Sequence, residues 1–179
     1  GEKALPRIMQ RMTDLGVETH LGHKIVRFEA GKVVTEGGKF NADLILFMPG
    51  MTGNPWFDNT ALPRSPGGLI EADAHCRVPG FACTYVAGDA GSFPGPDWMP
   101  KQAHMADLQA TSAAANLILE LQGKTPDRTF RVELMCVIDD NSSGTLVTRT
   151  QRFNMVLPRM GLAHRSKVLF EKLYLRRYR

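Results

Sequence analysis

The sequence predicts an α/β protein with some α+β character, and three stretches of the 179-residue chain carry this prediction. The run DLILFMP at 43–49 is almost continuously apolar, which is typical of a strand buried on both faces. A strand that ends on Gly-Asp precedes a loop and an alanine-rich helix over roughly 100–122. Two strand-like stretches, 130–140 and 144–156, then lead into an amphipathic, helix-like segment at 163–177.

The N-terminal part of the chain predicts short elements separated by turns. Residues 4–15 have helical spacing, and Gly16 is suited to end that helix. A short strand is expected at 17–22, followed by a β-meander over 23–50 that ends with the apolar run 43–49. Further along, 68–89 predicts two short strands around a Val-Pro-Gly turn.

The composition is that of an ordinary globular protein. Hydrophobic residues make up 43% of the chain, and no apolar run approaches the roughly 20 residues of a membrane-spanning helix. Three cysteines have no zinc-ligand spacing, the histidines suggest no metal site, and an odd cysteine count suits a reducing compartment.

The positive charge is concentrated at the C-terminus. The segment 164–179 contains six Lys or Arg residues and one Glu, so it carries +5, whereas the net charge of the whole chain is +4. Such a segment favours an acidic surface as partner, most simply anionic lipid or nucleic acid. Since no nucleic-acid-binding motif accompanies the charge, we expect no nucleic-acid partner.

The stretch TYVAGDAGSFPGPDWMPKQ at 84–102 has the features of a ligand site. Strand ends in open α/β sheets are where ligands bind, and Gly88 would allow close approach to its backbone. Asp89 offers a carboxylate to hydroxyl groups. Pro100 suits the first turn of the next helix, whose N-terminus favours an anion or an electron-rich ring edge. The alternative is an ordinary turn, with Lys101 as a solvated charge.

The motif YVAGDA, with the Gly/Pro loop and small-residue helix behind it, resembles the second flavin motif of the pyridine nucleotide–disulfide oxidoreductase superfamily. The resemblance implies FAD as cofactor, with Gly88 and Asp89 at the ribityl chain. It also implies that Pro100, Lys101 and Gln102 lie at the pyrimidine end of the flavin. A helix dipole and a lysine would stabilise the negative charge of a reduced flavin there.

The two G-x-G-x-x-G fingerprints of such flavoproteins do not occur in this sequence. We therefore expect the C-terminal part of a longer protein, with a partial two-dinucleotide-binding-domain fold. On this interpretation 1–60 is the end of the second, NAD-type domain, and 61–122 closes the FAD domain. The remaining 123–179 forms a C-terminal domain of strands and a helix with a basic tail.

The stretch ELMCVIDDNSSGTLV, the step PKQ and the basic tail resemble sulfide:quinone oxidoreductases and flavocytochrome c sulfide dehydrogenases. The resemblance implies an enzyme that oxidises sulfide and reduces a quinone, with Cys136 as the catalytic cysteine at a strand end. Its partner cysteine would come from an earlier domain. Cys83, in an apolar strand-like stretch, is interpreted as a core residue, and Cys76, which belongs to no motif, as structural or exposed. Cys136 could also be an ordinary buried cysteine.

Two other functions remain open. A type II NADH:quinone oxidoreductase shares the fold and the membrane tail but needs no redox cysteine. A folding or interaction module, inactive without an N-terminal half, needs no flavin at all. Trp98 could cover the flavin edge or fill a hydrophobic gap, and His104 could transfer protons.

The tail at 163–179 has Leu and aromatic residues on one side and Lys or Arg on the other. This pattern is typical of an interfacial helix, although the apolar side could instead pack on the protein. We therefore expect a cytoplasmic or peripheral membrane protein, with a homo-oligomer as a further possibility.

Overall fold

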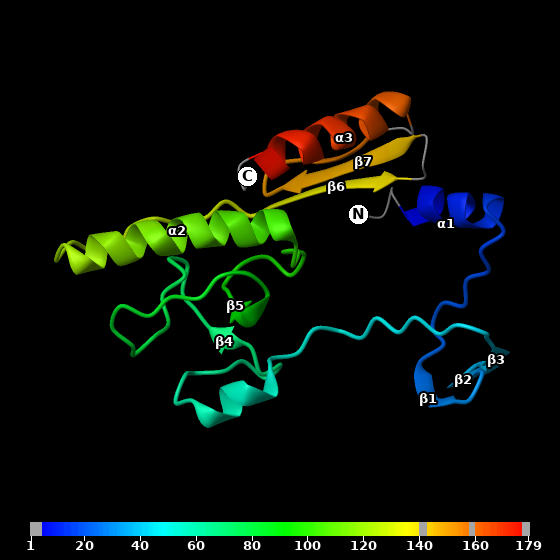
Figure 1. Ribbon diagram of the computed structural model, residues 1–179, viewed down its shortest axis with the longest axis horizontal. Helices are drawn as coiled ribbons and strands as arrows, with labels where there is room; N and C mark the ends of the chain where they lie inside the picture. Colours follow the sequence, from blue (N-terminus) through cyan, green and yellow to red (C-terminus); the bar gives the residue numbers. More distant parts are fainter. Residues whose placement is uncertain (1–4, 140–142, 158–159, 177–179) are drawn as a thin grey trace. The chain divides into compact units, whose positions relative to one another are not determined.

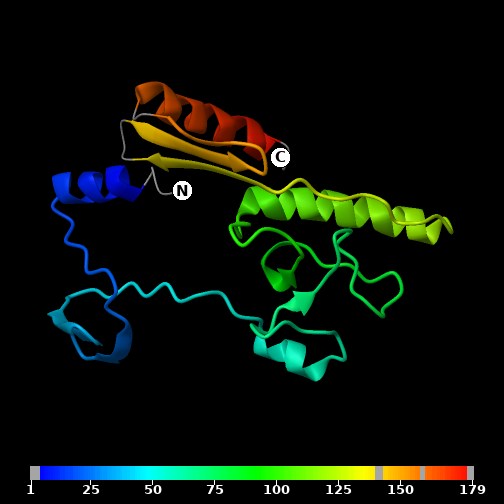
Figure 2. The same ribbon diagram turned by 180° about the vertical axis from the view of Figure 1, so that it is seen from behind.

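The computed structural model describes residues 5–139, 143–157 and 160–176 (Figure 1). The chain divides into two compact units, Gly1–Gly50 and Met51–Arg179, and each is described by itself. The same elements are seen from behind in Figure 2. The domain boundaries predicted after 60 and after 122 remain predictions.

The first unit contains one helix and a three-stranded antiparallel meander. Helix α1 spans Leu5–Asp14, and the strands are β1 (Ile25–Glu29), β2 (Lys32–Thr35) and β3 (Gly38–Asn41). Helix and meander are confirmed at nearly the predicted positions. Gly16, with φ of 74°, follows the helix, as a left-handed C-terminal residue does.

Two strands predicted in this unit are wrong. Residues 17–22 are irregular, and the apolar run 43–49 has no regular secondary structure; Met48 within it is 92% exposed. A strand buried on both faces needs neighbouring strands and covering layers. No described strand pairs with this run, so its hydrophobicity alone does not produce a strand.

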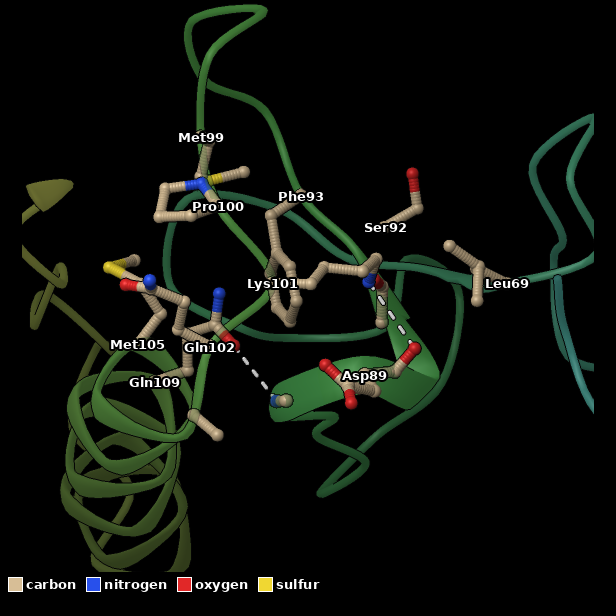
Figure 3. Close-up of a pocket in the computed structure, with 13 residues that line it drawn as sticks. Leu69, Asp89, Ser92, Phe93, Met99, Pro100, Lys101, Gln102, Met105 and Gln109 are labelled. Atoms are coloured by element: carbon tan, nitrogen blue, oxygen red, sulfur yellow. Dashed lines mark hydrogen bonds between the residues drawn. The ribbon is translucent and has the colours of Figure 1, made fainter. Parts of the chain in front are cut away.

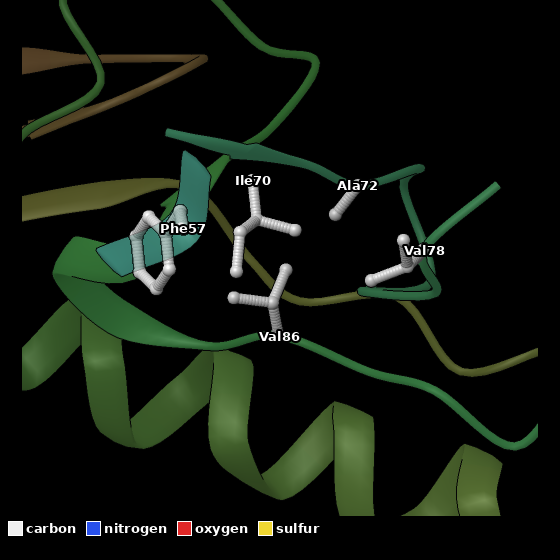
Figure 4. Close-up of a cluster of buried hydrophobic side chains, with 5 residues drawn as sticks. All are labelled: Phe57, Ile70, Ala72, Val78 and Val86. Atoms are coloured by element: carbon white, nitrogen blue, oxygen red, sulfur yellow. The ribbon is translucent and has the colours of Figure 1, made fainter. Parts of the chain in front are cut away.

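The second unit begins with short elements around a small core. These are the 3-10 helix η1 (Pro55–Asn59), strand β4 (Ile70–Glu71), the single turn η2 (Gly88–Ala90) and strand β5 (Gly91–Ser92). Five side chains point toward one another between them in Figure 4: Phe57, Ile70, Ala72, Val78 and Val86.

The strands predicted around the Val-Pro-Gly turn are mostly wrong. The turn exists, but Arg77 and Tyr85 form only an isolated antiparallel bridge. Instead β4 pairs in parallel with β5, through Ile70 with Gly91 and Glu71 with Ser92. This long-range pairing places the strand that follows the Gly-Asp turn beside Ile70 and Glu71, and local patterns do not reveal such a contact.

Helix α2 spans Ala103–Leu121, so the predicted helix is confirmed but its start is not. Pro100 and Lys101 precede the helix, and Gln102 is its N-cap in an extended conformation. The first helical hydrogen bond runs from Ala106 N–H to the carbonyl of Gln102, at 2.9 Å between N and O. Gly123, with φ of 71°, follows the C-terminal end as expected.

The C-terminal part is an antiparallel sheet covered by a helix. Its strands are β6 (Glu133–Asp139), β7 (Gly144–Thr150) and β8 (Asn154–Val156), so the single strand predicted at 144–156 is in fact two. Helix α3, Gly161–Leu175, lies along β6 and β7 (Figures 1 and 2), close to the predicted 163–177. Residues 177–179 of the predicted tail lie outside the described residues.

Candidate functional site

The Gly-Asp motif forms a tight turn packed against α2. Gly88 has φ of 69°, and a Cβ at this position would lie 3.2 Å from Cβ of Ala106. Its N–H donates to the side-chain oxygen of the buried Gln109, at 2.8 Å. Glycine is required here both by the left-handed backbone and by the close approach of the helix. The turn therefore has a defined position relative to the helix N-terminus.

Lys101 joins the two sides of the site. Its Nζ donates to the carbonyl oxygen of Gly91 at 2.8 Å and to that of Asp89 at 3.3 Å (Figure 3). Partial burial lowers the pKa of the ammonium, and the charge of Asp89 acts in the opposite direction. Lys101 thus ties the segment before α2 to the Gly-Asp turn, a contact that the sequence did not indicate.

These elements enclose a pocket with a volume of about 140 Å³ (Figure 3). All five residues predicted to bind cofactor line it: Gly88, Asp89, Pro100, Lys101 and Gln102. The structure thus brings together residues separated by a loop of ten positions. Sites for drug-sized ligands enclose about 300–1,000 Å³, so this pocket has room for one part of a large cofactor.

Two features of the pocket fit the polar edge of a flavin ring. No side chain caps the first turn of α2, so backbone N–H donors remain at the helix N-terminus. The side-chain oxygen of Gln102 is buried and has no hydrogen-bond partner. A ring that both accepts and donates hydrogen bonds would satisfy these groups. The exposed carboxylate of Asp89 fits a hydroxylated chain at the mouth.

Cys136 does not line this pocket. It lies in the middle of β6, not at a strand end as predicted, and is half-buried opposite Val147. The strand continues past it to Asp139, because the β6–β7 pairing extends to the Asp139–Gly144 pair. All three cysteines are free thiols.

The other two cysteines differ in environment. Cys76 is fully buried, and this burial raises the pKa of its thiol to about 12. A thiol with so high a pKa stays protonated and unreactive. Cys83 is exposed and has φ of 50°. The interpretation of Cys83 as a core residue is therefore wrong.

A charged cluster that sequence reasoning missed connects α2 to β6. His104 Nε2 lies 2.7 Å from Oε1 of the buried Glu133, and Arg131 Nε lies 2.6 Å from Oε2 of the same carboxylate. The hydrogen bond with His104 is the main cause that lowers the pKa of Glu133. His104 thus has a structural partner at the edge of the pocket region.

Gln109 was also missed, although helical spacing could have revealed it. Residues 102, 105, 106 and 109 follow the three- and four-residue intervals of one helix face, and all four line the pocket. Glu133 carries no such signal, because its contact with His104 joins segments far apart in sequence. Within the described ranges, no group of three or more His, Cys, Asp or Glu side chains could hold a metal ion.

A profile of the pyridine nucleotide-disulphide oxidoreductase family matches residues 1–110, more than half of the chain. The chain belongs to this family. The match covers the first unit and the Gly-Asp turn and reaches into α2, and so includes the pocket described above.

Solved structures of the same fold agree with this assignment. Sulfide:quinone oxidoreductase from Aquifex aeolicus superposes with a TM-score of 0.81 at 17% identity, covering 95% of this chain and 44% of that one. An FAD-dependent pyridine nucleotide-disulphide oxidoreductase from Desulfovibrio vulgaris superposes with a TM-score of 0.53 at 17% sequence identity, and the match covers 83% of this chain and 38% of that one. Water-forming NADH oxidase from Lactobacillus brevis superposes with a TM-score of 0.51 at 15% sequence identity, and the match covers 81% of this chain and 33% of that one.

These likenesses confirm the predicted fold class and the resemblance to sulfide:quinone oxidoreductase-like flavoproteins, at the level of fold. The chain spans less than half the length of each of these three proteins.

Proposed function

We propose that this chain is the C-terminal portion of an FAD-dependent oxidoreductase that oxidises sulfide at a cysteine pair and reduces a quinone. The observation that carries the proposal is the pocket between the Gly-Asp turn and the uncapped N-terminus of α2. Membership of an oxidoreductase family and the fold shared with a sulfide:quinone oxidoreductase support the same function.

In this proposal the pocket holds the central part of the cofactor. Asp89 accepts hydrogen bonds from ribityl hydroxyls, and the backbone at Gly88 lets the chain pass closely. Pro100 packs against the ring, while the orphaned oxygen of Gln102 and the N–H groups of α2 pair with its polar edge. Lys101 holds the two walls together. When bound, FAD supplies two-electron transfer from the sulfur site to the quinone.

Cys136 is the sulfur-carrying residue in the proposed reaction. Hydrosulfide attacks a disulfide between Cys136 and a cysteine outside this chain, so that one S–S bond breaks and another forms. The products are a persulfide on one cysteine and a thiolate on the other. A second hydrosulfide attacks the outer sulfur of the persulfide and carries it away as hydrodisulfide, which leaves that cysteine as a thiol. The thiol and the thiolate then re-form the disulfide with release of one proton and two electrons. The two electrons pass through FAD to the quinone, which takes up two protons.

The test is Cys136→Ser in the full-length protein that contains this chain. We expect sulfide oxidation to be lost while bound flavin, measured by its visible absorption, is unchanged. Cys83→Ser is the matched control and should retain activity, since Cys83 is an exposed thiol away from the pocket lining. Unchanged sulfide oxidation in Cys136→Ser, with NADH-dependent quinone reduction, would instead indicate the type II NADH:quinone oxidoreductase. A full-length protein without flavin absorption would indicate an interaction module.

We further propose that α3 contacts a membrane surface. Exposed apolar and exposed basic residues share this helix and its C-cap: Leu162, Val168, Leu169, Phe170, Leu173 and Leu175 with Arg165, Lys172 and the C-cap Arg176. Apolar and cationic side chains together favour the interface of an anionic bilayer. Over the described residues, no helix is both long and apolar enough to cross a bilayer.

Sedimentation with lipid vesicles tests this contact. We expect binding to vesicles of phosphatidylcholine with phosphatidylglycerol, weaker binding to phosphatidylcholine alone, and a loss of binding in Leu169→Gln. The control is Leu121→Gln, which removes a similarly exposed leucine from α2. Equal binding of both variants would contradict a role for α3.

A further inference from the structure

A tryptophan next to the pocket stacks on an arginine of the C-terminal sheet. Trp98 immediately precedes Met99 and Pro100, which line the pocket. The guanidinium carbon of Arg149 lies 4.4 Å from the centroid of the Trp98 ring, within the range of a cation–π interaction. Arg149 belongs to β7, so this contact joins the pocket segment to the sheet that contains Cys136.

The strand register places Cys136 and Arg149 on the same face of that sheet. Cys136 pairs with Val147, and Leu134 pairs with Arg149. Directly opposed residues share a face, and so do residues two apart along a strand. Cys136 and Arg149 are therefore diagonal neighbours on one face.

Helix α3 covers the other face of the sheet. Asp139 lies three positions after Cys136 on the same strand, so its side chain points to the opposite face. Its carboxylate contacts two residues of α3: His164 Nδ1 lies 2.9 Å from Oδ1 of Asp139, and Lys167 donates to Oδ2. A Cβ at Gly144, which pairs with Asp139, would meet Val137 and Ala163. The Cys136 face is thus turned away from α3, and it is the face whose Arg149 reaches Trp98.

A second contact holds the same end of the sheet. Glu133, the first residue of β6, binds His104 in the first turn of α2, and its N–H donates to the sulfur of Met105 at 3.5 Å. Glu133 is adjacent to Leu134, the partner of Arg149. Trp98, just before the pocket, and His104, at the start of α2, therefore contact the sheet at neighbouring positions. Arg149 belongs to the Leu134–Arg149 pair, and Glu133 belongs to the adjacent Glu133–Thr150 pair.

We propose that Arg149 is a positioning residue whose stack on Trp98 sets the distance between Cys136 and the pocket. The role of Cys136 in this statement rests on the proposed function, whereas the stack itself does not. The contact of Glu133 with His104 holds one corner of the sheet, about which the sheet could still rotate. The second contact, between Trp98 and Arg149, prevents this rotation. Without the stack, the sheet would stay folded but the Cys136 face would move relative to Met99 and Pro100.

A fluorescence experiment on this chain tests the position of Cys136 without flavin, sulfide or quinone. A bimane label on Cys136 is quenched when a tryptophan comes into contact range. Trp56→Phe leaves Trp98 as the only tryptophan, and Cys83→Asn removes the exposed thiol while suiting a left-handed backbone. Cys76 stays unlabelled because it is buried.

In this background we expect bimane emission to be quenched relative to a Trp98→Phe variant. Arg149→Met keeps the length of the side chain but removes the cation, and should relieve the quenching. Arg149→Lys keeps a cation at this position and should therefore retain part of the bimane quenching. The matched control Arg152→Met changes an exposed arginine of the same sheet region and should leave the quenching intact. Equal quenching in Arg149→Met and in the parent background would overturn the proposal.

A second measurement avoids the label. In the Trp56→Phe chain, Arg149→Met should shift the emission of Trp98 and raise its quenching by acrylamide, whereas Arg152→Met should not. Circular dichroism should be the same for all variants. If Arg149→Met left the emission and the acrylamide quenching of Trp98 unchanged, the proposed contact between Trp98 and Arg149 would be contradicted.

The effect on catalysis separates this proposal from the proposed function. In the full-length protein, Arg149→Met should lower kcat/KM for sulfide several-fold at unchanged flavin content, with partial rescue by Arg149→Lys. If Cys136→Ser abolishes sulfide oxidation while Arg149→Met is fully active, positioning by Arg149 fails and the proposed function stands. If Cys136→Ser has no effect, the proposed function fails whatever the fluorescence shows.

Discussion

At the scale of single residues, polar contacts position the segments that surround the pocket. Gly88 is bonded to Gln109, Lys101 spans two carbonyl groups, and Glu133 holds His104. Each contact joins segments that are at least ten residues apart in the chain. The identities of Gly88 and Lys101 were predictable from the motif, but their partners were not, because hydrogen-bond partners depend on how the segments pack.

Glu133 makes the stability of the second unit depend on pH. Its folded-state pKa is lowered, so it stabilises the folded chain above the unfolded carboxyl pKa of about 4.3. That contribution is lost as the pH falls through the lower, folded-state value. We expect the difference in free energy of unfolding between the natural chain and Glu133→Gln to shrink below about pH 4. Urea unfolding from about pH 7 to about pH 3 measures it, and an equal difference across this range would contradict the prediction.

The matched control for this titration is Glu71→Gln, which changes an exposed glutamate of β4. The control should show a small and nearly constant difference across the same range of pH. A pH-dependent loss in both variants would point to general charge effects in place of the His104–Glu133 pair.

At the scale of elements, α2 organises the second unit. Its N-terminal turn forms one wall of the pocket, and farther along the fully buried Asn116 holds two loops. The Asn116 amide group donates to the carbonyls of His75 and Arg128, and its oxygen accepts from Arg128 N–H at 2.8 Å. Alanine-rich periodicity was enough to predict this helix, whereas its start was misplaced because Pro100 suits a first turn but lies before it.

Replacing Asn116 by Ala should destabilise the second unit strongly. The three hydrogen bonds of Asn116 to backbone groups of His75 and Arg128 would be lost, and a hydrogen bond typically contributes about 0.5–1.5 kcal/mol. Urea unfolding followed by circular dichroism measures the change. Asn154→Ala, at an exposed position on β8, is the control and should stay within about 0.5 kcal/mol of the natural chain. Similar values for both variants would show that the Asn116 network contributes little.

At the scale of the whole molecule, the two units differ in how much they bury. Among residues 5–50, Val34 is the one buried hydrophobic side chain, and every residue of β1 is exposed. The second unit contains the five-residue core and the buried face of α2. Local stability follows buried contacts, so the two units should not be equally protected.

Amide hydrogen exchange should resolve this difference. We expect the backbone amides of β1–β3 to exchange much faster than those in the middle of α2, near Asn116. Mass spectrometry of proteolytic peptides measures both regions in one experiment, and the β6–β7 pair provides an internal reference. Equal protection of β1–β3 and α2 would contradict the prediction.

The sequence by itself determined the features that depend on local chemistry. The Gly-Asp turn, the small-residue helix after it, the β-meander and the amphipathic C-terminal helix all follow from backbone preference and apolar periodicity over a few residues. The tertiary structure alone decided which distant segments meet. It paired β4 with β5, left the apolar run 43–49 without a strand partner, and put Cys136 on the sheet face of Arg149. The physical reason is that strand pairing, burial and ion pairs join residues far apart in sequence, and no local pattern encodes their partners.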